Sequence, residues 1–148
     1  MKYLTYDGIG RYLVAAEARG MLPMFYLELS TGLRRGELIS LMWTDLDIHD
    51  RMLYIRRTAN RVKGYNEILI GTPKTQNSIR QIKLPQETVD LLIQEHEKHP
   101  DNVYMFPSPV SGGIWDPTAI SNLHKKILKD AGLQDIRFHD LRHPSLPC

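Results

Sequence analysis

The residues from Met52 to Leu84 differ from the segments on either side in residue type and in the spacing of their apolar residues. This difference constrains the fold more than any other feature. Within this stretch MLYIRRTANRV, NEILIG and SIRQIKLP are rich in β-branched and aromatic residues or alternate apolar with charged ones, as strands do. The flanking segments instead space their apolar residues as amphipathic helices do. This order predicts an α+β fold, mainly helical, with a small three-stranded antiparallel sheet at one edge.

Local signals place the helix ends. Gly32 is the expected C-cap of a helix that begins at Leu22, and Pro117 suits the first turn of a helix that stops near Gly132. A short strand is expected from Val103 to Phe106. The other predicted helices span residues 5–19, 35–42 and 87–99, and a last one begins near His139.

The length of 148 residues is typical of one domain. No apolar run is long enough to span a bilayer, and the amino terminus lacks the apolar core of a signal peptide. The single cysteine, Cys148, cannot form an internal disulfide, which fits a reducing compartment. We therefore expect a soluble cytoplasmic protein without a membrane partner.

Charge is distributed unevenly along the chain. The segment from Arg51 to Lys83 carries eight basic residues against one acid, Glu67, whereas the rest carries eleven basic and sixteen acidic residues. A basic stripe on an acidic body is typical of proteins that bind a phosphate backbone. The alternative is a solvated hairpin face whose charges are offset by neighbouring acids.

Two stretches place cations at bends of the chain. In TGLRRGEL the glycine bend exposes Arg34 and Arg35 at a helix start, with Glu37 within reach of the Arg34 guanidinium. In GTPKTQNSIRQIKLP, Lys74 lies in a turn between two strand-like runs. Each also has an ordinary structural explanation, as an exposed ion pair for the first and a solubilising lysine for the second.

The stretch FHDLRH near the carboxyl end places His139, Arg142 and His143 on one helix face. A histidine that titrates near neutral pH and a planar guanidinium suit phosphoryl transfer. Two alternatives stay open. The two histidines could bind a metal ion, although no third ligand is evident. Alternatively, Pro144 could end the helix and leave a frayed tail.

Taken in order, TGLRRGEL, the turn lysine within PKTQNSIRQIKLP, FPSP and FHDLRH resemble the catalytic domain of the tyrosine recombinases, the phage integrase family. The resemblance extends from about Leu4 to His143. It implies that residues 1–143 form an incomplete recombinase catalytic domain and that residues 144–148 are a tail outside it. The amino-terminal core-binding domain of the family is not recognisable.

The resemblance also implies an active site around a scissile DNA phosphate. Arg34, His139 and Arg142 match the residues that surround the phosphate, and Lys74 matches the lysine that protonates the departing 5′ oxygen. Glu37 is expected to orient Arg34. No metal or cofactor is required, and no small-molecule substrate is implied. The residues expected to contact double-stranded DNA are Arg56, Arg57, Arg61, Lys63 and Arg80.

The family attacks the phosphate with a tyrosine that follows H-x-x-R. All seven tyrosines of this sequence precede His139, and PSLPC stands where the next helix is expected. We therefore expect a truncated integrase fragment of a phage or conjugative element, inactive alone. The alternative is a non-enzymatic DNA-binding remnant or regulator that keeps the phosphate-binding cage. Self-association on DNA is left open.

Overall fold

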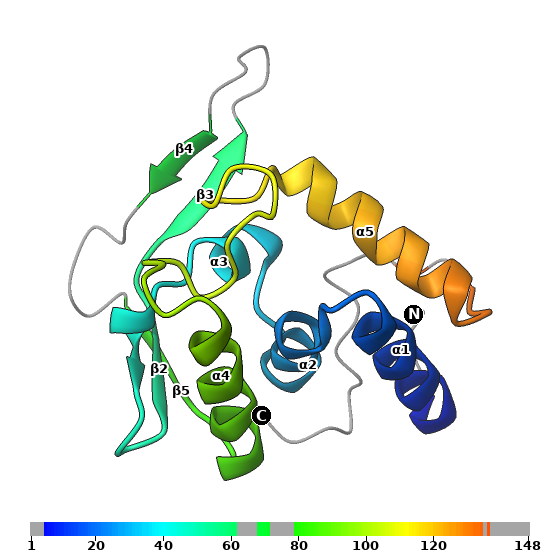
Figure 1. The fold of residues 1–148 in the computed structure, drawn as a ribbon, viewed down its shortest axis with the longest axis horizontal. Helices are drawn as coiled ribbons and strands as arrows, with labels where there is room; N and C mark the ends of the chain where they lie inside the picture. Colours follow the sequence, from blue (N-terminus) through cyan, green and yellow to red (C-terminus); the bar gives the residue numbers. More distant parts are fainter. Residues whose placement is uncertain (1–4, 62–67, 72–78, 135, 137–148) are drawn as a thin grey trace. The chain divides into compact units, whose positions relative to one another are not determined.

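The computed structural model describes residues 5–61, 68–71, 79–134 and 136 (Figure 1). The chain forms two compact units: residues 1–34 together with 118–148, and residues 35–117. Helices account for the described elements of the first unit, and the strands all lie in the second. The predicted α+β fold with a small antiparallel sheet is confirmed. The helix expected near His139 lies outside the described residues.

Three helices make up the described part of the first unit: α1 (Tyr6–Ala18), α2 (Leu22–Thr31) and most of α5 (Pro117–Asp130). The Thr5 hydroxyl caps α1 by accepting a hydrogen bond from the Gly8 amide at 3.0 Å. Gly32 ends α2 in the left-handed conformation, as its C-cap position predicts. These three helices follow the sequence prediction closely.

The core of the first unit is built around Tyr12 of α1, which is fully buried. Its ring meets Phe25 of α2 edge-on, with ring centroids 5.9 Å apart. Ile120 and Ile127 of α5 are also fully buried. At the surface the Arg19 guanidinium donates to Asp130 at 2.7 Å, and this hydrogen bond lowers the pKa of the Asp130 carboxyl.

Two small antiparallel sheets make up the β-structure of the second unit. The first has the order β1 (Leu46–Asp47), β2 (Met52–Ile55), β5 (Arg80–Lys83). The second pairs β3 (Thr58–Arg61) with β4 (Ile68–Gly71). The prediction placed three strands in one sheet, whereas the structure has two sheets. The first half of MLYIRRTANRV, β2, pairs with β5, and its second half, β3, pairs with β4 of NEILIG.

Shorter elements complete the second unit: α3 (Arg35–Ile39), the 3₁₀ helix η1 (Trp43–Asp45) and α4 (Gln86–Lys98). α3 ends earlier than predicted because the chain leaves the helix after Ile39, and Leu41 and Met42 pair with the backbone of residues 104 and 105 before η1 begins. The strand expected near Tyr104 is reduced to one bridge with Met42. Trp43 stacks on His96, with centroids 4.1 Å apart, and so packs η1 against α4. No helix in the described part of the chain has the length and apolarity that a membrane span requires.

Gly36 permits the closest backbone approach in the second unit. A Cβ atom at this position of α3 would overlap the carbonyl oxygen of Ala59 and would lie 2.6 Å from the Thr58 hydroxyl, both in β3. A backbone carbonyl cannot move aside as a flexible side chain can. The glycine of RRGE is thus required by the packing of α3 on β3, a reason that the sequence does not reveal.

We predict that Gly36→Ala destabilises the protein by about 1 to 3 kcal/mol through overpacking, although alanine is the better helix former. Gly10→Ala is the matched control, because Gly10 lies within α1 with nothing within 4 Å of its added Cβ. The control should stabilise by up to about 1 kcal/mol. Urea unfolding of both variants measures the free energies, and stabilisation by Gly36→Ala would contradict the packing.

Candidate functional site

Arg34 lies directly after the bend that ends α2. Gly32 reverses the chain, and the following Leu33 is fully buried, with its amide 3.4 Å from the Thr31 hydroxyl. Arg34 itself is exposed, whereas Arg35 is half-buried as the first residue of α3. Local structure therefore presents Arg34 to solvent, as the TGLRRGEL motif predicts.

Glu37 forms a two-pronged ion pair with Arg80 inside the second unit. Arg80 Nη2 lies 2.9 Å from Glu37 Oε1, and Arg80 Nη1 lies 3.3 Å from Oε2. The pair joins α3 to the start of β5, where Arg80 is in register with Ile55. Arg80 is therefore engaged with a carboxylate. That Glu37 orients Arg34, and that Arg80 contacts DNA, both stay predictions.

A second carboxylate, that of Asp45 in η1, forms ion pairs with two residues of the basic segment, Arg56 and Arg57. Its side chain is only 1% exposed. Arg57 Nη1 lies 2.6 Å from Oδ2 and Nη2 lies 3.3 Å from Oδ1, while Arg56 Nε lies 3.3 Å from Oδ1. The amide of Met42 also donates to Oδ2 at 2.9 Å. Because these donors converge on both oxygens, the buried charge is neutralised where it lies.

Arg57 makes further contacts that fix it within the fold. Its Nη1 donates to the Ser40 carbonyl at 3.1 Å, and the Ser40 hydroxyl, which lies 2.8 Å from the Gly36 carbonyl, is also 3.1 Å from the Arg57 carbonyl. Only 15% of its side chain is exposed. Arg56 is more open and lies over the Tyr54 ring, 4.8 Å from its centroid. The geometry favours a structural role for Arg57 and leaves Arg56 with one face toward solvent.

These ion pairs change the interpretation of the basic segment. Among its described side chains, Arg56, Arg57 and Arg80 all pair with acids outside the segment, Asp45 or Glu37. The alternative of neighbouring acids that offset the charge therefore holds for these three residues. The remaining predicted site and DNA-contact residues cannot be placed: the Arg61 side chain, Lys63, Lys74, His139 and Arg142 lie outside the described part of the structure.

A sequence model of the phage integrase family matches residues 14–145. The chain belongs to the phage integrase family. The matched range includes Arg34, Lys74, His139 and Arg142, the four residues that the motif order predicts to act on phosphate. The family assignment made from the sequence is thereby confirmed, whereas the role of each residue stays a prediction.

Curated relatives of this integrase-family chain are bacterial and phage proteins. A XerC-like tyrosine recombinase of Caldanaerobacter subterraneus is 28% identical over 150 residues, which cover 87% of this chain and 38% of the relative. The ICEBs1 integrase of Bacillus subtilis is 30% identical over 124 residues, covering 76% of this chain and 33% of the relative. The chain thus spans about a third of the length of these relatives.

Solved structures of integrases and recombinases share the fold. The XerA recombinase is 26% identical with a TM-score of 0.75, covering 97% of this chain and 48% of that chain. The Tn1549 transposon integrase in complex with transposon right end DNA has a TM-score of 0.81 at 19% identity, covering 94% of this chain and 50% of that chain. The catalytic-domain fold expected from the resemblance is confirmed.

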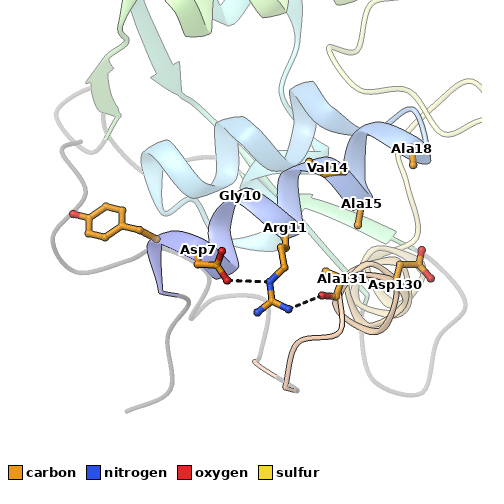
Figure 2. Close-up of a pocket in the computed structure, with 9 residues that line it drawn as sticks. Asp7, Gly10, Arg11, Val14, Ala15, Ala18, Asp130 and Ala131 are labelled. Atoms are coloured by element: carbon orange, nitrogen blue, oxygen red, sulfur yellow. Dashed lines mark hydrogen bonds and ion pairs between the residues drawn. The ribbon is translucent and has the colours of Figure 1, made fainter.

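The described part of the first unit contains a groove. It has a volume of about 910 Å³ and runs between α1 and the end of α5 (Figure 2). Arg11 crosses it, with Nε 3.2 Å from Asp7 Oδ2 and Nη1 3.3 Å from the Ala131 carbonyl. Among the predicted site residues that the structure describes, none lines the groove.

Sequence reasoning missed two polar groups. One is Asp45, which the charge count treated as part of the acidic remainder, although WTDLD places it only eleven residues before Arg56. The other is the buried His124 of α5, which the helical pattern alone does not distinguish from an exposed position. No sequence signal identifies either group, because both are defined by their tertiary partners.

We predict that Arg57→Ala lowers the free energy of unfolding by about 3 kcal/mol, because it leaves the buried Asp45 carboxylate undercompensated. Arg56→Ala, the neighbouring control on the same carboxylate, should cost about 1 kcal/mol or less because that side chain is more exposed. Denaturant unfolding provides the measurement. Equal losses at the two positions would mean that Arg57 is only another surface charge.

Proposed function

We propose that this chain is the DNA-binding catalytic part of a site-specific tyrosine recombinase that acts in DNA integration and recombination by phosphoryl transfer in the bacterial cytoplasm. The observation that carries the proposal is the family match over residues 14–145, which contains the ordered motifs of Arg34, Lys74, His139 and Arg142.

The proposed chemistry follows from the residue types. Arg34 and Arg142 hold the non-bridging oxygens of a scissile phosphate and stabilise the additional negative charge of the transition state. Lys74 supplies the proton to the departing 5′ oxygen, and His139 gives acid or base support. Glu37 positions the start of α3, next to Arg34 in sequence, through its ion pair with Arg80.

Structures of the relatives support double-stranded DNA as the partner. The Tn1549 transposon integrase was solved with circular intermediate DNA, and lambda integrase was solved as a dimer on a core site and as a tetramer on a Holliday junction. We extend DNA binding, and self-association on DNA, to this chain as proposals.

We predict that the chain binds duplex DNA weakly and that its affinity falls steeply with salt, since phosphate contacts release counterions. Arg34→Ala should weaken binding about tenfold and reduce the slope of log K against log salt by about 1. Arg35→Ala is the control and should change both much less, because Arg35 is half-buried. Fluorescence anisotropy of a labelled duplex at several salt concentrations measures both quantities. Equal effects at the two arginines would indicate a generic basic patch.

A second prediction concerns strand cleavage. The 148-residue chain should form no covalent adduct with a nicked suicide substrate, because none of its seven tyrosines follows Arg142, where the family's nucleophile is expected. Denaturing gels detect the adduct. The comparison is the same chain extended through the coding sequence downstream of codon 148. An adduct from the extended form alone supports phosphoryl transfer, whereas an adduct from the 148-residue chain would contradict the assigned position of the nucleophile.

A further inference from the structure

His124 of α5 is a buried polar residue with both ring nitrogens engaged. Only 2% of the His124 surface is exposed to solvent. Its Nδ1 lies 2.9 Å from the Tyr12 hydroxyl of α1, and its Nε2 bonds the carbonyl oxygen of Ile136. We call these three groups, the Tyr12 hydroxyl, the His124 ring and the Ile136 carbonyl, the His124 network.

The chemistry of the partners fixes the direction of both hydrogen bonds. A carbonyl can only accept, so Nε2 must carry a hydrogen. In the neutral ring Nδ1 then accepts, and Tyr12 must donate. Burial raises the pKa of the Tyr12 hydroxyl, and the charge of Glu28 raises it further, so that this hydroxyl keeps its proton. The network therefore specifies the Nε2–H tautomer of His124.

The network fixes the chain at one point beyond the end of α5. The helix ends at Asp130, and Gly132 turns the backbone with a positive φ of 69°. The chain then returns to His124 at Ile136, which is 1% exposed. Ile136 precedes His139 by three residues and Arg142 by six. A constraint at the Ile136 carbonyl thus acts immediately before the H-x-x-R segment.

We propose that His124, oriented by Tyr12, is a positioning residue: it anchors the backbone at Ile136, three residues before His139, and this anchor supports the proposed action of His139 and Arg142 on a DNA phosphate. The inference rests on the proposed function for its role in phosphate binding, but the anchoring of the segment is independent of it. An ordinary buried histidine would only satisfy its own polar atoms. A positioning residue additionally controls the order of the residues that follow Ile136.

Two conservative variants separate these roles. His124→Gln keeps an N–H donor near the position of Nε2, and so keeps the bond to Ile136 while losing that to Tyr12. His124→Asn keeps an acceptor near Nδ1, and so keeps the bond from Tyr12 while losing that to Ile136. Ile127→Ala is the stability control, since Ile127 is fully buried on the same helix and takes no part in the network.

Amide hydrogen exchange of residues 137–143 measures the anchoring without any ligand. His124→Asn should accelerate exchange in this segment by about tenfold, and His124→Gln by less than about threefold, after correction for global stability. Nitrogen-15 NMR of His124 should show the Nε2–H tautomer. Exchange that follows global stability alone in all three variants, or the Nδ1–H tautomer, would overturn the proposal.

Duplex binding then tests whether the anchoring serves phosphate contact. In the parent chain Arg142→Ala should weaken binding of a labelled duplex about tenfold, whereas in the His124→Asn background the same change should have less than about a threefold effect. Independent effects would overturn the positioning role. If the parent binds no duplex, the proposed function fails, and the exchange measurement still decides whether His124 anchors the segment.

Discussion

The buried carboxylate of Asp45 is the charge on which the second unit depends. Its side chain is only 1% exposed, so nearby donors must compensate its negative charge. Arg57, at the junction between β2 and β3, and the amide of Met42, just before η1, both donate hydrogen bonds to this carboxylate. The same guanidinium holds the Ser40 carbonyl just after α3. One buried charge thus joins η1, the end of α3 and the β2–β3 junction. The β-rich run divides between the two sheets at the same two arginines, Arg56 and Arg57.

A similar arrangement joins α3 to β5 through Glu37 and Arg80. In both cases the arginine comes from the segment that the charge count marks as basic, and the acid comes from outside it. The electrostatic consequence is that this part of the basic segment is largely neutralised within the protein. Arg34 lies exposed after the Gly32 bend, and its contact with a phosphate stays a prediction.

Local signals in the sequence predicted much of the fold. Gly32 and Pro117 mark helix ends by backbone chemistry alone, and both positions were predicted correctly. The division of the strand at Arg57 could not be predicted, because it depends on a partner in another element. The Tyr12–His124 contact joins residues 112 positions apart and leaves no local trace. For the site, motif order predicts Lys74, His139 and Arg142, and all three lie outside the described residues.

The central proposal is that Arg34 contacts a DNA phosphate, whereas Arg57 stays paired with Asp45 inside the fold. Side-chain Nε–H NMR during titration with a short duplex tests it most directly, because each arginine is observed separately. The account predicts that the Arg34 signal shifts on addition of duplex at low salt while the Arg57 signal stays in place. A shift of Arg57 as large as that of Arg34 would contradict the account.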